Sequence, residues 1–460
     1  MSQLSYRQNE MSAPLEFNQR DLGHGSTGTI LNPLVLAALV VAIVLVWTLP
    51  RKYVIVPLMV ITFLVPRGQV IYVVGIHFYV RFILLLVGGA RLFREKWRIA
   101  GGINTIDKIF CVWLFYRVAA EIITNGASAL AEQLNFGIQG YCGYFLLRRL
   151  IQNEEDIART AKVFAVVAAI LGVCMMFEFK THVNIFGYLG GAPLSPEIRN
   201  GKTRAQAIFG HSILAGCFGG TLVPLFFWLW KSGRAKVPAA VGIAGSTLMV
   251  MASSSSTPVL AYAAGFLGLL LWPIRKSMRI IRWGIVLTLV VLALAMKAPV
   301  WFVIAHVDVV GGSGGYDRAL LVDVFMKHIR DWWLFGTNQN GTWGYDMWDQ
   351  SNQFVAEGEC GGLVAIVGFI TMISLCYSRI GTMRRRLTPR KQWLVWSLGA
   401  VMLAHIFAYF GVAYWDQTQI WWFAFLAMVS AATTPSLKEP VAVRDHAINE
   451  STISLEPTSA

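Results

Sequence analysis

Long apolar stretches recur along the chain, and polar or basic segments separate them. A helix needs about 20 apolar residues to cross the hydrocarbon core of a bilayer, so this pattern predicts a series of membrane-spanning helices. We expect twelve or thirteen of them, because the second stretch is short and the fifth is only moderately apolar. The expected spans lie near residues 30–49, 53–66, 70–90, 105–124, 130–148, 160–179, 206–230, 237–252, 258–273, 283–298, 360–379, 392–412 and 419–433.

The polar segments set the expected division of the chain. The first residues lack the basic region and apolar core of a cleavable signal sequence, so the first apolar stretch should remain in the membrane. One polar segment late in the chain is long enough to have a function of its own. The expected parts are a flexible polar tail (1–29), a transmembrane helical bundle (30–298), a large external loop (299–359), C-terminal transmembrane helices (360–433) and a flexible cytoplasmic tail (434–460).

Basic residues outnumber acidic ones, with 39 Lys and Arg against 25 Asp and Glu and a formal net charge of +14. Most of the excess lies in short loops, which alternate with loops that are poor in charge or much longer. This alternation predicts that the basic loops are cytoplasmic and that residues 299–359 face the opposite side. An orientation signal in the membrane explains the charge better than nucleic-acid binding does.

The composition indicates an all-α polytopic membrane protein. Hydrophobic residues make up 56% of the chain, charged residues make up 14%, and the mean hydropathy is +0.56. Soluble domains usually contain roughly 25% charged residues. The 6 cysteines are scattered, with no CxxC pair and no His/Cys cluster. That spacing favours neither a disulfide framework nor a zinc site.

Charged residues within the expected spans are candidates for function, because burying a charge in the bilayer is costly. Arg81 lies in the middle of one span, and Arg117 and Glu121 lie in the external half of another. The latter two are four residues apart and therefore share one helical face. Two interpretations are open: the pair neutralises itself and holds a helix interface, or these three residues support a substrate site.

A second group of charges lies at an external helix start. The segment "PEIRNGKTRAQAIFGHSILAGCFGG" brings Arg204 and His211 to the mouth of a span rich in small residues. A basic entrance at a helix start, with glycines that permit close approach, suits an anionic head group. Interfacial basic residues above a closely packed helix are the alternative interpretation.

The external loop contains a helical pattern in "YDRALLVDVFMKHIRDWW", where apolar residues recur at spacings of three and four. The pattern predicts an amphipathic helix that lies on the membrane surface or covers a cavity. Its His328 is either a polar-face residue or a general base. Further along, Trp343, Trp348 and Asn352 provide flat rings and an amide of the kind that bind sugars, although interfacial anchoring explains the tryptophans almost as well.

Three segments, taken in order, resemble one family. They are "TRAQAIFGHSILAG", "DRALLVDVFMKHIRDWWLFGTNQNG" and "SNQFVAEGECGGLVAIVGF". Together with the many spans and the late external loop, they are similar to the O-antigen ligase and Wzy-type polymerase superfamily of bacterial envelope glycosyltransferases. The chain departs from the ligases in two motifs. Ser351 stands where they commonly carry His, and Thr257 and Pro258 stand where an Arg follows a serine pair. The departures favour a polymerase-type or divergent member.

The resemblance implies a metal-independent glycosyltransferase in the bacterial inner membrane, with its active face in the periplasm. The donor would be an oligosaccharide on undecaprenyl diphosphate, and other polysaccharide assembly proteins would be partners. No cofactor is implied, since the leaving diphosphate is already activated. Arg204 and Arg318, with His211, are the expected diphosphate ligands, because a guanidinium binds phosphate oxygens bidentately and keeps its charge.

The acceptor hydroxyl needs a base within reach. We rank Asp349 first, because it lies two residues before Ser351, where the family histidine is missing. His328 is second and Glu357 third. A loop or capping carboxylate is the alternative for Asp349.

Other function classes remain open. A ligase would transfer the glycan to a lipid or protein acceptor, and a transporter or flippase would also use buried charge pairs. Transporters more often show pseudo-symmetric halves, which this sequence lacks. A non-catalytic subunit of a polysaccharide export complex is the third alternative.

Overall fold

The computed structural model describes residues 28–73, 76–95, 97–306, 314–344, 347 and 351–434. Most of both predicted tails and part of the predicted loop lie outside these residues. The structure is 76% helical, with almost no sheet, as expected for an all-α membrane protein. The helices are α2 (Pro33–Thr48), α3 (Arg51–Leu64), α4 (Val80–Glu95), α5 (Thr105–Asn125), α6 (Leu130–Leu150), α7 (Glu154–Thr181), α8 (Ser212–Lys231), α9 (Lys236–Ala252), α10 (Ser256–Leu270), α11 (Met278–Ala295), α12 (Gly315–Lys327), α13 (Ile329–Trp332), α14 (Gln353–Arg386), α15 (Pro389–Tyr409) and α16 (Gln417–Ala432).

The predicted number of spans does not fit this structure. Among the described residues, 5 helical segments are long and apolar enough to cross a membrane: α7, α8, α14, the segment Arg275–Ala295 that contains α11, and Lys391–Tyr409 in α15. The helices α3, α4 and α16 have 14, 16 and 16 residues. At 1.5 Å per residue they are about 21–24 Å long, which is shorter than a hydrocarbon core of about 30 Å. Apolar composition in the sequence therefore overestimated the number of full-length spans.

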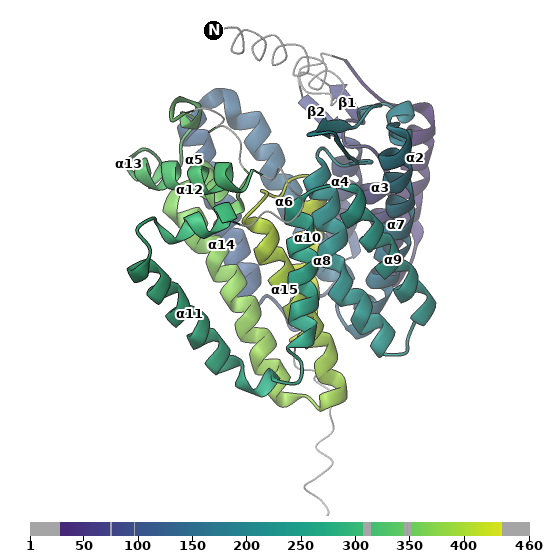
Figure 1. Cartoon of the computed structure of the whole chain (residues 1–460). Helices are drawn as coiled ribbons and strands as arrows, with labels where there is room; N and C mark the ends of the chain where they lie inside the picture. The colour runs from purple at the N-terminus through teal and green to yellow at the C-terminus, as the bar shows by residue number, and fades with distance from the viewer. Residues whose placement is uncertain are drawn as a thin grey trace, which may run out of the picture.

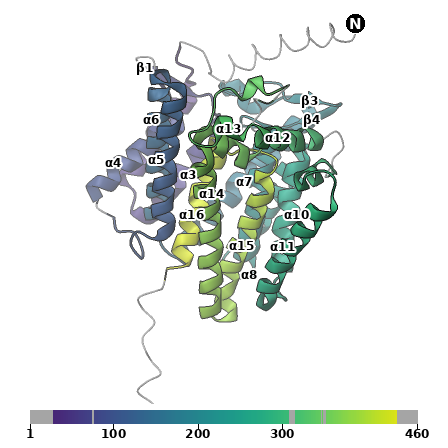
Figure 2. The same cartoon turned by 90° about the vertical axis from the view of Figure 1, so that its left-hand side faces the viewer.

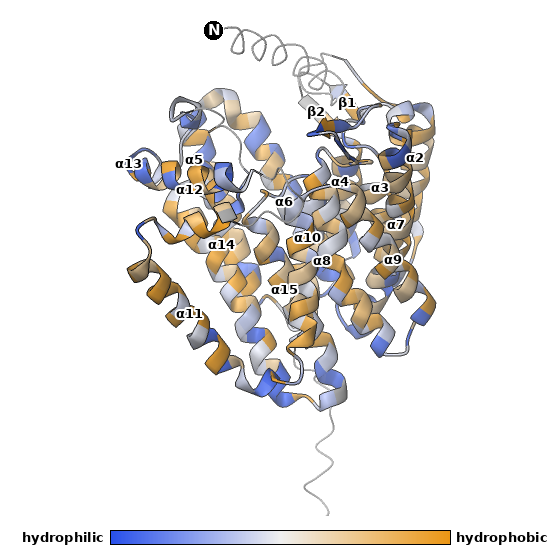
Figure 3. Ribbon diagram, viewed as in Figure 1, coloured by the Kyte–Doolittle hydropathy of each residue, from blue (hydrophilic) through white to orange (hydrophobic). Residues whose placement is uncertain are grey.

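The helices form a bundle with smaller elements across one end. Helix α7 packs along α9, α8 packs along α9 and α10, and α10 packs along α15. Figures 1 and 2 show α12 and α13 lying across the same end that carries the strands. Figure 3 shows apolar residues along the helices and hydrophilic residues gathered toward their ends. This end of the bundle is where the predicted external residues meet.

Small residues allow the closest helix contact. A Cβ added to Gly172 of α7 would overlap the carbonyl oxygen of Gly245 of α9, and a Cβ on Gly245 would overlap the backbone of Ala168. Between membrane helices, such glycines let two backbones approach and gain packing energy that larger residues would prevent. The pair therefore fixes α7 against α9.

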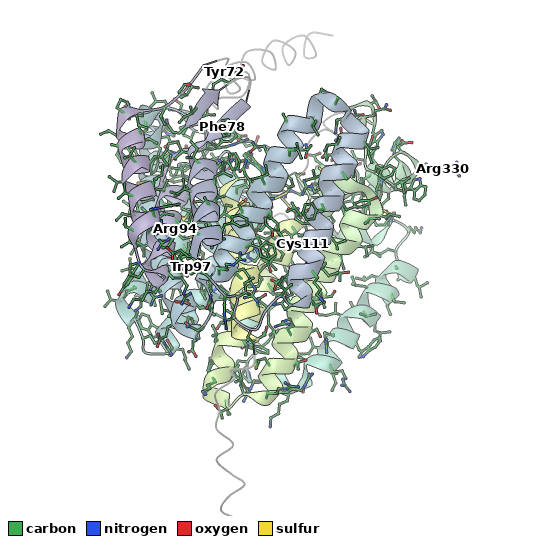
Figure 4. All side chains as sticks on the ribbon, turned by 180° about the vertical axis from the view of Figure 1, so that it is seen from behind. Tyr72, Phe78, Arg94, Trp97, Cys111 and Arg330 are labelled. Carbon is green, nitrogen blue, oxygen red and sulfur yellow. The ribbon has the colours of Figure 1, made fainter. Side chains whose placement is uncertain are left out.

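The predicted span over 70–90 is wrong in its first half. Strands β1 (Val70–Val73) and β2 (Ile76–Tyr79) form an antiparallel hairpin, and α4 begins only at Val80. Alternating β-branched and aromatic residues favour strands over a helix here. Figure 4 labels Tyr72 and Phe78 of this hairpin near one end of the molecule. Arg81 therefore lies in the first turn of α4, not in the middle of a membrane span.

Helix α14 begins at Gln353, inside the predicted loop, and is interrupted at Gly361 and Gly362. Gly362 has a φ of +61°, and a Cβ there would overlap the carbonyl of Leu334. The segment before α14 supplies replacement hydrogen bonds: Thr337 N donates to Glu359 O at 2.8 Å, and Leu363 N donates to Trp333 O at 2.9 Å. The inserted segment accounts for the kink and fixes part of the predicted loop to α14.

Candidate functional site

Arg204 belongs to a small hairpin at the end of the bundle. Strand β3 (Glu197–Arg199) pairs with β4 (Lys202–Arg204) across Asn200 and Gly201. Both turn residues have positive φ, +51° and +71°, and Asn-Gly is a preferred pair for such a two-residue turn. The register places Glu197 opposite Arg204. The sequence of the turn thus determines which acidic residue faces the arginine.

The Glu197 carboxylate forms an ion pair with Arg204. Oε1 and Oε2 each lie 2.9 Å from Nη1 of Arg204. The side chain of Arg204 is 6% exposed, whereas that of Glu197 is 45% exposed. The arginine is therefore fixed within the protein, and the carboxylate reaches it from the surface.

His211 caps the start of α8 beside this pair. Its Nδ1 accepts a hydrogen bond from Ile213 N at 3.1 Å, so a neutral ring has its proton on Nε2. Nε2 lies 3.9 Å from Oε2 of Glu197. Burial and the charge of Arg204 lower the pKa of His211 to about 4, with further lowering by two other arginines and opposition from Glu197. His211 is thus neutral at pH 7, and its Nε2–H group lies on the side of the Glu197 carboxylate.

Arg318 comes to the same place from the external loop. It lies in the first turn of α12, is half-buried, and acts electrostatically on both His211 and Cys217 near the start of α8. The charges of two predicted diphosphate ligands, Arg204 and Arg318, therefore both act on the third, His211. We define the arginine site by the charged groups that act on His211 and by His211 itself: Arg199, Arg204, Arg318, Glu197 and His211.

His328 lies away from the arginine site. It ends α12, ten residues after Arg318, which is about 15 Å along a helix. Its Nδ1 is 2.9 Å from the carbonyl oxygen of Val324, so Nδ1 donates to it, and its ring stacks on Trp343 with 4.8 Å between centroids. Asp349 and Trp348, two other predicted site residues, lie outside the described residues.

Glu357 is buried in the interface between α5 and α14. Its carboxylate accepts from Trp113 Nε1 at 2.8 Å, from Gln353 Nε2 at 2.7 Å and from Arg117 Nη1 at 3.2 Å. The side chain of Glu357 has no exposed surface. Three internal donors and full burial make it a structural carboxylate, which does not favour its ranking as a base.

The same contacts change the expected partner of Arg117. The ion pair of Arg117 is with Glu357, whereas Glu121 accepts from Asn125 Nδ2 at 2.7 Å. Glu121 still attracts Arg117 electrostatically. The ion pair of Arg117 is thus made with a carboxylate from a distant helix, while both Glu357 and Glu121 act on its charge.

Asn352 is a helix cap. Its Oδ1 accepts from Phe354 N at 2.9 Å and from Val355 N at 3.3 Å, and its side chain is buried. Its neighbour Gln353 accepts from Tyr414 N at 2.6 Å, which joins α14 to the turn before α16. Asn352 thus orders the start of α14, and its predicted contact with a glycan stays a prediction.

The sequence analysis did not predict Asp416 or Arg67, which lie close to the arginine site. Asp416 forms ion pairs with Arg67 and with Arg81. The Arg67 guanidinium lies 4.1 Å from the ring of Trp415, and a Cβ on Gly210, directly before His211, would overlap that ring. This second cluster is therefore in contact with the chain that forms the arginine site. A single acidic residue in the short loop 413–418 was the available signal.

No group of three or more His, Cys, Asp or Glu residues that could hold a metal ion occurs in the described part of the chain. One buried arginine, two more accessible arginines and a neutral histidine are the chemical resources of the site. They suit an anionic ligand, and a diphosphate in particular.

The comparisons with known proteins give no family. No model of a known protein family matches this chain, and no curated protein matches it at a significant level. The resemblance to bacterial envelope polymerases and ligases thus remains a prediction from the quoted motifs.

Proposed function

We propose that the chain is a membrane glycosyltransferase that polymerises oligosaccharide repeat units linked to undecaprenyl diphosphate. The convergence of Arg204, Arg318 and neutral His211 at the start of α8 is the observation that supports this proposal. Helix α8 is itself apolar and long enough to cross a membrane. A fixed cationic site therefore lies directly above hydrocarbon-compatible helices, which is the arrangement that a lipid-linked diphosphate requires. We place the active face in the periplasm of a bacterial inner membrane.

The proposed reaction needs charge stabilisation on one side of the sugar and proton removal on the other. The acceptor oxygen bonds to the anomeric carbon, the bond to the diphosphate breaks with its electron pair on the diphosphate, and the acceptor proton passes to a base. The arginines stabilise the charge that develops on the leaving group, and His211 donates from Nε2. Neither task requires a nucleotide.

Asp349 and His328 are the proposed bases, in that order. Glu357 is set aside as a base because its oxygens accept from three internal donors. About 15 Å of α12 separates His328 from Arg318. His328 therefore reaches a substrate only if the glycan extends that far from the diphosphate. A repeat unit of several sugars has that reach.

The test uses purified protein in liposomes with an undecaprenyl-diphosphate-linked repeat unit. Chain length and released lipid diphosphate are followed by gel and mass spectrometry. We expect longer chains on the lipid for the wild type, and strong loss of elongation for Arg204→Ala and Arg318→Ala. Arg330→Ala is the matched control, because Arg330 is exposed and Figure 4 shows it at the outer edge of the molecule. Normal elongation by folded Arg204→Ala and Arg318→Ala proteins would refute the diphosphate site.

The same preparation distinguishes the other functions. Transfer that occurs only after a lipid or protein acceptor is added would identify a ligase. Movement of the glycolipid across the bilayer without any transfer would identify a transporter. The position of Ser351 in place of the ligase histidine is the reason for placing the polymerase first.

A further inference from the structure

Glu197 is the negative member of the arginine site. Three arginines and one carboxylate act on His211, namely Arg199, Arg204, Arg318 and Glu197. The three arginines lower the pKa of His211, and the carboxylate raises it. The carboxylate therefore lowers the charge of a site whose expected ligand is an anion, and it does so from a position in direct contact with Arg204.

The two lipid ligands of the proposed reaction differ in charge. The donor is a diphosphate diester, in which each phosphate has one ionised oxygen. The lipid diphosphate left after transfer is a monoester, whose terminal phosphate has a charge of about −1.5 to −2 at neutral pH. The product is thus more negative than the donor, and a strongly cationic site would retain it.

We propose that Glu197 sets the charge that the arginine site accepts, so that the site holds the diphosphate diester and releases the lipid diphosphate monoester. The inference rests on the proposed function and adds a specificity-determining residue to it. Because Glu197 is in contact with Arg204 at 2.9 Å, its carboxylate repels the additional negative charge of the monoester.

The geometry of the hairpin supports this role. Glu197 is half-exposed and all of β3 is exposed, whereas Arg204 is almost completely buried. The carboxylate is able to move aside for a phosphate oxygen while Arg204 stays in place. Even then, Glu197 remains within the hairpin, because its backbone pairs with that of Arg204. Its charge therefore persists beside a bound ligand.

A role as the general base fits Glu197 less well. Its two oxygens lie 2.9 Å from the arginine nitrogen proposed to bind the leaving diphosphate. In a direct displacement the base acts on the opposite face of the sugar from the leaving group. Glu197 lies on the side of the leaving group, where it influences binding and release.

The experiment compares a monoester and a diester on the intact protein in nanodiscs. The probes are farnesyl diphosphate and farnesyl diphosphate esterified at its terminal phosphate with N-acetylglucosamine. Dissociation constants at pH 7.5 are measured for the wild type, Glu197→Gln and Glu197→Ala. We expect both variants to bind the monoester about two- to fivefold more tightly, as for a partly exposed charge pair, with a smaller change for the diester.

Glu155→Gln is the matched control. Glu155 is an exposed carboxylate in the first turn of α7, and it should leave both dissociation constants unchanged. In proteoliposomes supplied with the donor, the later turnovers of Glu197→Gln should slow more than those of the wild type as product accumulates. A purely structural role of Glu197 would slow all turnovers equally.

The outcomes separate this inference from the proposed function. If the wild type binds neither probe, the arginine site and this inference both fail. If the wild type binds both probes and the preference is unchanged in both Glu197 variants, this inference alone fails. Loss of both ligands in folded variants would show that Glu197 holds Arg204 in position, which would also overturn it.

Discussion

Arg117 of α5 and Glu357 of α14 form an ion pair at 3.2 Å although 240 residues separate them in the chain. The carboxylate is fully buried, and the guanidinium is mostly buried. The pair connects α5, early in the chain, to α14, which begins inside the predicted loop. Its contribution to stability is therefore a direct test of how α14 is held.

Removal of either partner should destabilise the protein. A buried charge that loses its partner typically costs about 3–5 kcal/mol. We expect Arg117→Ala and Glu357→Ala to lower the melting temperature strongly in detergent, and Glu357→Gln to lower it less, because an amide still accepts from Trp113. Glu155→Gln is the control and should have a small effect, since Glu155 is an exposed carboxylate in the first turn of α7. Stable Glu357→Gln protein with no turnover would instead support a catalytic role.

The contact between α7 and α9 gives a second prediction. Gly245→Ala forces a methyl group against the backbone of Ala168, where the Cβ would overlap. Overpacking of this kind costs about 1–3 kcal/mol. Gly284→Ala in α11 is the matched control, because a Cβ at Gly284 has no atom within 4 Å among the described residues. Thermal unfolding of both variants in the same detergent should give a lower melting temperature for Gly245→Ala than for Gly284→Ala. Equal melting temperatures would contradict the close approach of the two helices.

His211 predicts a specific dependence of stability on pH. Its pKa falls from an ordinary value of 6.5 to about 4 in the folded protein, so folding favours the neutral ring. The stabilisation is complete above about pH 6.5 and is lost as the pH falls toward 4. The charged groups that act on the ring are Arg199, Arg204, Arg318 and Glu197.

The measurement is the melting temperature from pH 7 to pH 4 for the wild type and His211→Gln. We expect the wild type to lose more stability than the variant across this interval, because glutamine does not titrate. Parallel curves for the two proteins would show that His211 is not held in the neutral form by its surroundings.

Part of the fold and of the candidate site could be predicted from the sequence. The all-α membrane class followed from apolar length and charge, whereas the roles of Arg204, His211 and Arg318 stay predictions from the motifs. The partners Asp416 and Glu357 depended on tertiary contacts. The position of Glu197 opposite Arg204 could have been predicted, because the Asn-Gly turn fixes the register of the hairpin. The pairing of Arg117 with Glu357 could not, because helical spacing favoured the local residue Glu121 over one 240 residues away.

The predicted number of membrane spans does not fit the structure for a different reason. Hydropathy detects apolar composition but does not fix where a helix ends. In residues 70–90 the apolar pattern covers a β-hairpin and the first turns of α4. Pro50 caps α3, and α3 ends shortly before Pro66, so its 14 residues form a short element. Local breakers and strand propensity divided stretches that composition alone had joined.

Asp416 gives the fourth prediction. It balances two mostly buried arginines, Arg67 and Arg81, and it adjoins Trp415, which packs on Gly210. Asp416→Asn should lower the melting temperature and weaken binding of diphosphate probes a few-fold, because the chain leading to His211 loses its support. The double variant Asp416→Asn/Arg81→Gln should recover part of the stability, since it removes one uncompensated charge. Additive losses in the double variant would show that the two residues are not coupled.

The proposed bases give the last prediction. His328 has its Nδ1 on the carbonyl of Val324 and its ring on Trp343, contacts that hold the end of α12. We expect His328→Gln to lower stability while retaining most of the polymerisation rate, and Asp349→Asn to remove turnover without loss of donor binding. Rates in proteoliposomes, measured beside donor dissociation constants, separate these effects. If His328→Gln abolishes turnover at unchanged donor affinity and Asp349→Asn does not, the base is His328, and the acceptor hydroxyl must then bind near the far end of α12.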